Sequence, residues 1–166
     1  GISTGRGGEI EITATSGADE VFIQSNGQLL ASSAGGHGGE IRYTGNAIQE
    51  GSSQVHTGAS GYNGGTITIT GSTSNNFTLQ NNGILYANGR TTGTSSNAGT
   101  ITISSGTVDL GQGLIKAEGA NSGGTAGTVN ISATNGALNT TNGFQLWNLG
   151  DSAGSVTLSS TGATNI

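Results

Sequence analysis

Short stretches in which a polar residue alternates with an apolar one recur along the chain, each directly after two small residues. They read Gly-Gly-Glu-Ile-Glu-Ile from Gly7, Gly-Gly-Glu-Ile-Arg-Tyr from Gly38, Gly-Gly-Thr-Ile-Thr-Ile from Gly64, Ala-Gly-Thr-Ile-Thr-Ile from Ala98, Ala-Gly-Thr-Val-Asn-Ile from Ala126 and Ala-Gly-Ser-Val-Thr-Leu from Ala153. Successive side chains of a strand point to opposite faces, so a period of two predicts a β-strand with one buried face.

The spacing of these strands indicates a repeat architecture. Their first apolar residues are Ile10, Ile41, Ile67, Ile101, Val129 and Val156. The intervals between them run from 26 to 34 residues. Each interval holds two further short apolar stretches, such as Val21 to Ile23 and, beyond the corner Asn26-Gly27, Leu29 with Ala31. Three short strands per interval predict an all-β fold, a right-handed parallel β-helix (β-solenoid) of about six coils. The hand follows from the general rule for parallel crossovers.

Alternation divides the first strand of each coil into an inward column and an outward face. The inward residues are Ile10, Ile12, Ile41, Tyr43, Ile67, Ile69, Ile101, Ile103, Val129, Ile131, Val156 and Leu158. The outward face carries a threonine ladder, which consists of Thr66, Thr68, Thr70, Thr100, Thr102 and Thr128. We expect the inward residues to stack coil on coil, and each buried aliphatic side chain to contribute roughly 1.5–3 kcal/mol.

Composition agrees with a thin core. Only 31% of the 166 residues are hydrophobic, and 33 are glycine. A collagen-like chain is excluded because the sequence has no proline and no three-residue glycine period. The formal net charge of −5 argues against nucleic acid as a partner, and no apolar run is long enough for membrane insertion. Residues 1–166 are therefore interpreted as one repeat array that requires no cofactor.

Both ends of the sequence fall in the middle of a coil. The residues around Ile2 and Ser3 resemble the tail of a third strand, and those around Asn165 and Ile166 resemble a second strand. Two explanations fit: the chain belongs to a longer solenoid, or copies stack end to end. In either case the predicted partner is further solenoid.

The Thr-Ile-Thr-Ile and Asn-Gly-x-Leu-x-Ala elements resemble the passenger repeats of filamentous-haemagglutinin-like, two-partner-secreted bacterial exoproteins. The likeness covers essentially the whole chain. It implies a secreted, rod-shaped protein of the cell surface or biofilm matrix that acts as an adhesin or a filament. It implies no active site.

Residues that carry catalysis are scattered, so we expect no enzyme. Acids fall at different coil positions, mostly turns: Asp19, Glu20, Glu50, Asp109, Glu118 and Asp151. Glycan-cleaving β-helices need such acids in one cluster. His37 and His56 lie in Gly/Ser-rich loops, and we interpret them as solvated rather than as a metal-binding or pH-sensing pair.

No metal site is expected, although two carboxylates are weighed as a possible cation site. Stacking would bring Glu9 and Glu40 about 5 Å apart, a spacing that suits a shared cation. Their neighbours Glu11 and Arg42 are expected to form an ion pair on the same face and to neutralise it in part. A solvated charged face is the preferred interpretation.

Two surfaces suggest alternatives to a purely structural role. The threonine ladder resembles the Thr-x-Thr array of ice-binding β-solenoids, although exposed parallel strands also favour threonine. Tyr86 and Trp147 are expected to point outward from the third strand, where aromatic rings stack on sugars. Glycan binding or glycan-directed activity is therefore a third hypothesis.

Overall fold

A computed structural model describes residues 5–14, 20–56, 61–80, 82–140 and 143–166. The described chain contains strands and turns and no helix. Its strands form three parallel sheets, here called sheets 1, 2 and 3. Sheet 1 contains β1 (Glu9–Thr13), β4 (Glu40–Thr44), β7 (Thr66–Thr70), β10 (Thr100–Ser105), β13 (Thr128–Ala133) and β16 (Ser155–Ser160). Sheet 2 contains β2 (Glu20–Ile23), β5 (Asn46–Gln49), β8 (Asn76–Leu79), β11 (Thr107–Asp109), β14 (Leu138–Asn139) and β17 (Thr164–Asn165). Sheet 3 contains β3 (Gln28–Leu30), β6 (Ser52–Gln54), β9 (Ile84–Tyr86), β12 (Leu114–Lys116) and β15 (Gln145–Trp147).

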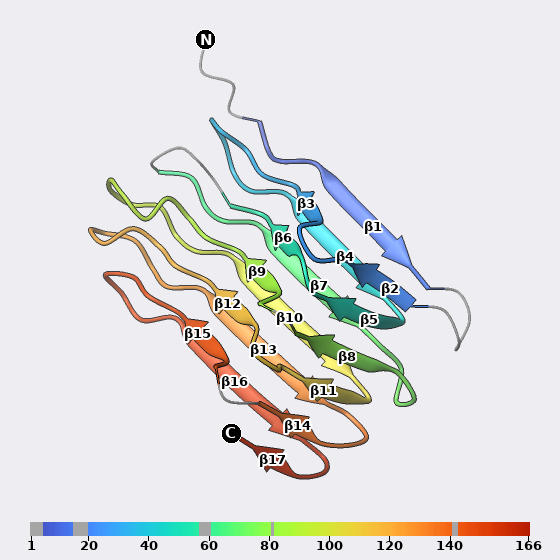
Figure 1. The fold of residues 1–166 in the computed structure, drawn as a ribbon. Coiled ribbons are helices and arrows are strands. Elements are labelled where there is room, and N and C mark those ends of the chain that lie inside the picture. Colours follow the sequence, from blue (N-terminus) through green and yellow to red (C-terminus); the bar gives the residue numbers. More distant parts are fainter. Residues whose placement is uncertain (1–4, 15–19, 57–60, 81, 141–142) are drawn as a thin grey trace.

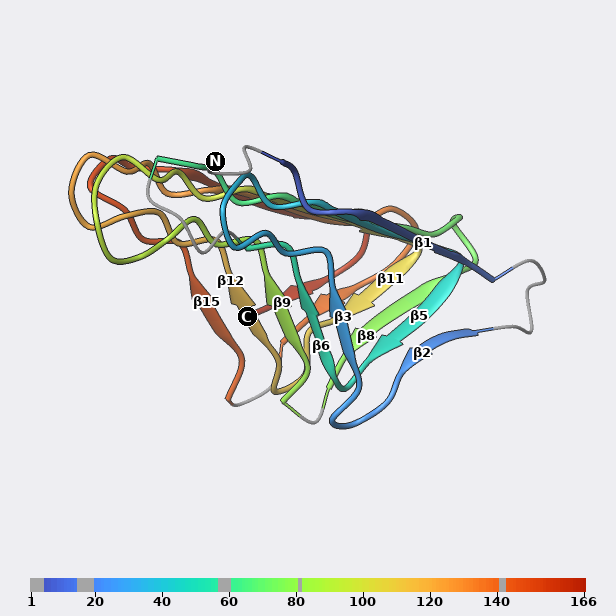
Figure 2. The ribbon, with the colours of Figure 1, turned by 90° about the horizontal axis from the view of Figure 1, so that it is seen from above.

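Each strand pairs with the corresponding strand one coil away, which makes the chain a β-solenoid (Figure 1). Ile67 lies opposite Ile41 on one side and Ile101 on the other, as the repeat predicts. Seen along the stack, the three sheets form the sides of a triangle (Figure 2). The solenoid has about five turns rather than six. Sheet 3 has five strands against six in sheets 1 and 2, since the last coil contributes only β16 and β17.

The core is a column of aliphatic side chains from all three sheets. Of the inward residues predicted in sheet 1, Ile41, Tyr43, Ile67, Ile69, Ile101, Ile103, Val129 and Ile131 are buried. Ile10, Ile12 and Leu158 are partly buried and pack against this core. Val156 is opposite Val129 in register but remains 45% exposed. The expectation that it is buried is wrong because, within the described chain, no strand covers the outer side of β16.

A column of glycines explains the invariant second residue of the repeated Gly-Gly or Ala-Gly pair. A Cβ atom added at Gly65 would lie 2.0 Å from the carbonyl oxygen of Gly39, and one added at Gly99 would lie 1.8 Å from that of Gly65. Gly127 and Gly154 continue the column, at 2.4 and 2.1 Å from the oxygen of the glycine one coil before. Here the coils approach too closely for any side chain.

The corner between sheets 2 and 3 uses residues with positive φ, as the Asn-Gly motif predicts. Asn26 and Asn82 have φ of 66° and 64°, and Gly111 has φ of 43° at the equivalent corner. Asparagine and glycine adopt this conformation at lower cost than other residues. The chain can therefore change direction within two or three residues and enter sheet 3.

One coil has a polar cluster inside the core. The Tyr43 hydroxyl donates to Gln49 Oε1 at 3.2 Å and contacts Ser53 Oγ, which itself donates to Gln49 Oε1 at 3.0 Å. Each sheet contributes one of these residues. Burial raises the pKa of Tyr43 to about 12, an effect partly opposed by the Ser53 hydrogen bond. Sequence alternation places Tyr43 inside but gives no reason to expect Gln49 and Ser53 there.

Candidate functional site

The threonine ladder forms as predicted on the outer face of sheet 1. Thr66, Thr100 and Thr128 occupy one row across three coils, and Thr68 and Thr102 occupy the next. Most of these side chains are half-buried between their neighbours, and Thr70 is exposed. Glu40 and Arg42 continue the two rows toward the amino end, and Asn130 follows Thr102. The two aligned threonine rows therefore extend over three coils at most, although Ser155 continues the first row and the row through Thr70 carries threonine or serine in every strand of sheet 1.

The acidic residues at the amino end of this face are bound by arginine. Glu9 and Glu40 are neighbours in register. Arg42 donates from Nε to Glu40 Oε1 at 2.9 Å and from Nη1 to Glu9, and Arg6 approaches Glu40 at 3.8 Å. The predicted Glu11–Arg42 ion pair is wrong. The two residues are opposite in register, but the guanidinium reaches the carboxylates of the adjoining row. Arg42 thus takes the place between Glu9 and Glu40 where a cation was considered.

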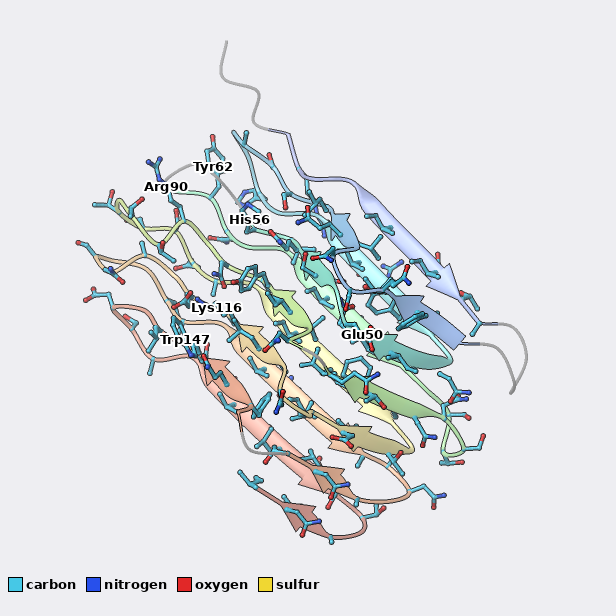
Figure 3. All side chains as sticks on the ribbon, viewed as in Figure 1. Glu50, His56, Tyr62, Arg90, Lys116 and Trp147 are labelled. Carbon is cyan, nitrogen blue, oxygen red and sulfur yellow. The ribbon has the colours of Figure 1, made fainter. Side chains whose placement is uncertain are left out.

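The outer face of sheet 3 carries a row that alternates aromatic and cationic groups. Tyr86, Lys116 and Trp147 lie opposite one another in three successive strands. Both aromatic residues point outward as expected, since Leu85 is fully buried and Leu146 packs on the core. Lys116 and Trp147 lie beside each other on this face (Figure 3). Lys116 Nζ stands 3.7 Å from the Trp147 ring centroid and 5.6 Å from that of Tyr86. Lysine therefore covers part of the Trp147 ring.

Beside Tyr86 the surface is hollowed. A hollow of about 260 Å³ over β6 and β9 is lined by Tyr86, Gln54, His56, Asn88 and Arg90, among others. A second hollow of about 440 Å³ over β3 and β6 shares Gln54 and His56 with it. The two hollows adjoin at Gln54 and His56 and follow one another along the stacking direction, and the pair is here called the sheet 3 groove.

Alternation predicted that Tyr86 points outward, and His56 was expected only as a solvated loop residue; Gln54, Asn88 and Arg90 were not predicted to lie beside them. The signal that could have identified them is the period of two, which continues beyond the end of each strand. Outward positions follow one another at Gln54 and His56 in one coil, and at Tyr86, Asn88 and Arg90 in the next. Because these segments lack the apolar alternation of sheet 1, their polar residues are easily mistaken for loop residues.

The two histidines have separate partners. His37 Nδ1 accepts a hydrogen bond from the Asn63 N–H at 3.0 Å. Its ring packs edge-on against Tyr62, with 5.2 Å between the ring centroids. His56 Nδ1 lies 3.1 Å from Ser32 Oγ, on the sheet 3 face. Neither arrangement uses the other histidine.

Four of the described acids outside sheet 1 each form a local contact. Glu50 accepts from Ser25 and Gln80, Asp109 accepts the Gly111 N–H, and Asp151 accepts the Gly123 N–H. Glu118 Oε2 lies 3.5 Å from Lys116 Nζ and accepts from Asn88 Nδ2 at 3.2 Å, and the Glu118 backbone N–H donates to Asn88 Oδ1 at 3.0 Å. Asp19 and the side chain of Glu20 lie outside the described residues. Within the part that is described, no three potential metal-binding side chains gather.

No match was found among protein families, curated proteins or solved structures. Among the residues described here, no helix has the length and hydropathy that crossing a bilayer would require. What the structure shares with haemagglutinin-like repeats is the β-solenoid itself.

Proposed function

We propose that this chain is part of a secreted, rod-shaped structural or adhesive protein that works without catalysis. The observation that supports this proposal most is the unbroken register in sheet 1 from β1 to β16. Each coil is bonded to the next by three parallel ladders, and the last one by two, in sheets 1 and 2. Such an array resists bending and projects the side chains of its outer faces. With coils about 4.8 Å apart, the described part extends roughly 25 Å along its axis.

Both ends of the rod suit the addition of further coils. Within the described residues, no strand pairs with the outer edge of β16 or of β1, and Val156 and Ile166 are 45% and 79% exposed. An exposed strand edge is a template for another strand. We propose that these edges continue into further solenoid, in the same polypeptide or in a second copy, to build a surface filament or a biofilm-matrix fibre. Asn165 belongs to β17, while Ile2 and Ser3 lie outside the described residues.

Location and assembly are tested separately. An antibody raised against the purified chain should label intact cells of the organism that makes it, and external protease should remove the label. Labelling only after permeabilisation would contradict an extracellular role. Negative-stain microscopy over a concentration series then distinguishes the two kinds of continuation. Axial fibres that lengthen with concentration indicate self-stacking, and short uniform rods indicate continuation within one polypeptide.

Ice binding is the second candidate function, and the aligned threonine rows favour it. Thermal hysteresis of the purified protein tests it. An ice-binding face should lose activity in Thr102→Arg, whereas Thr78→Arg on sheet 2 should retain it. If the unmodified protein shows no hysteresis, the threonine ladder has only a structural role.

A further inference from the structure

The sheet 3 groove has the chemistry of a saccharide site. It combines one aromatic side chain, Tyr86, with the amide of Gln54 and the imidazole of His56. Sugars present C–H faces that pack on aromatic rings, and hydroxyls that bond to amides and imidazoles. His56 is suited to this because Ser32 engages only its Nδ1. His56 Nε2 has no hydrogen-bond partner among the described residues, so this atom is available to a ligand.

The charge in the groove specifies the class of sugar. Arg90 is exposed, and its Nε donates to Thr92 Oγ1 at 3.3 Å. It forms no ion pair with any described acid. The nearby carboxylate, Glu118, is already engaged by Lys116 and Asn88. The two terminal nitrogens of Arg90 have no hydrogen-bond partner among the described residues. An arginine available in this way is the side chain best shaped to bind a carboxylate through two parallel hydrogen bonds.

The shape of the groove favours a polymer over a single sugar. The hollows of about 260 and 440 Å³ adjoin at Gln54 and His56 and follow the stacking direction across β3, β6 and β9. We propose that the sheet 3 groove binds an acidic polysaccharide, with a uronate carboxylate on Arg90 and its sugar ring against Tyr86.

Two neighbouring features do not belong to this site. Trp147 is excluded from the predicted aromatic pair because Lys116 lies over its ring and because it does not line the groove. The hollow of about 370 Å³ at the corner between sheets 2 and 3 contains Glu50, whose carboxylate would repel an acidic sugar. These features make the proposal specific to one face of the rod.

Binding is measured by isothermal titration calorimetry with trigalacturonate, and with maltotriose as a neutral trisaccharide of the same length. We expect trigalacturonate to bind at least about tenfold more tightly, and its affinity to fall in 0.5 M salt since an exposed charge pair is screened. Arg90→Gln should weaken trigalacturonate binding roughly tenfold or more, because a hydrogen bond to a charged group is lost. Tyr86→Leu should weaken the binding of both trisaccharides.

Arg6→Gln is the matched control, because Arg6 is also an exposed arginine but pairs with Glu40 at the edge of sheet 1. It should bind trigalacturonate as the unmodified protein does. Circular dichroism of each variant verifies that the coils remain intact. The proposal is overturned if the two trisaccharides bind equally, if neither binds, or if Arg90→Gln behaves like Arg6→Gln. None of these outcomes bears on the location or assembly of the rod.

Discussion

Substitution of Gly99 by alanine tests how closely the coils pack. A Cβ at Gly99 would stand 1.8 Å from the Gly65 carbonyl oxygen. The same oxygen accepts the Thr100 N–H at 3.0 Å. The two coils therefore cannot move apart at this point without lengthening a hydrogen bond of the ladder. We predict that Gly99→Ala strongly destabilises the fold even though it adds only one methyl group.

The size of the effect follows from this distance. A carbon atom and a carbonyl oxygen rarely approach closer than roughly 3.3 Å, so about 1.5 Å must be made up by displacement of the backbone. Overpacking a rigid interior costs about 1–3 kcal/mol, and a weakened backbone hydrogen bond adds about 1 kcal/mol. We expect the free energy of unfolding to fall by about 2–4 kcal/mol, and Tm by about 10 °C.

Ala98→Gly is the control. Position 98 is alanine here but glycine in the equivalent pairs at Gly38 and Gly64, so the change should cost about 1 kcal/mol or less. Urea unfolding, monitored by far-UV circular dichroism, gives the midpoint of each variant. If the m-values are equal, the difference in midpoint reports the difference in stability. If Gly99→Ala unfolds at the same urea concentration as Ala98→Gly, the close approach of the glycine column is refuted.

Three further predictions concern the core and the sheet 3 row. Ile101→Ala should cost about 3 kcal/mol because its side chain is fully buried, whereas Val156→Ala, in the same column but 45% exposed, should cost under about 1 kcal/mol; similar losses in urea unfolding would contradict this. The pKa of Tyr43 is raised to about 12 from 10.0, so the protonated hydroxyl stabilises the fold fully below pH 10. The free energy of unfolding should fall by roughly 2–3 kcal/mol as the pH rises through 12. Unfolding of Tyr43→Phe should lack that part of the pH dependence, and an unchanged profile would show that Tyr43 is not its source. Lys116→Gln should alter the emission of Trp147, the one tryptophan of the chain, and cost about 1 kcal/mol, whereas Arg90→Gln should leave the emission unchanged.

The repeat made the backbone predictable. Once Ile67 and Ile101 are placed in one column, the pairing of every strand in sheet 1 follows, and Asn26 and Asn82 mark the corner into sheet 3. A parallel ladder leaves no freedom in register, because a slip of one residue would turn the isoleucines outward. The direction of Tyr86 followed from the same alternation.

Side-chain partners were less predictable, because the repeat determines positions and not contacts. Arg42 stands opposite Glu11 but is long enough to reach the adjoining row, where two carboxylates attract it more strongly than one. Gln49 and Ser53 are inside because Tyr43 brings a hydroxyl into the same coil, and a buried hydroxyl needs partners. Of the groove residues that were not predicted, Gln54 ends a strand of only three residues, and His56, Asn88 and Arg90 lie beyond the ends of such strands, where the period of two is hard to recognise.

Spin-label distances test the central claim, that residues one repeat apart lie one coil apart in a single stack. The chain has no cysteine, so pairs of labelled cysteines can be introduced without background. Glu11, Arg42, Thr68, Thr102, Asn130 and Thr157 form one outward row. Pairs between position 157 and position 68, 42 or 11 should give distances that increase by about 4.8 Å at each step. Distances that do not increase in this order would contradict the stacked solenoid.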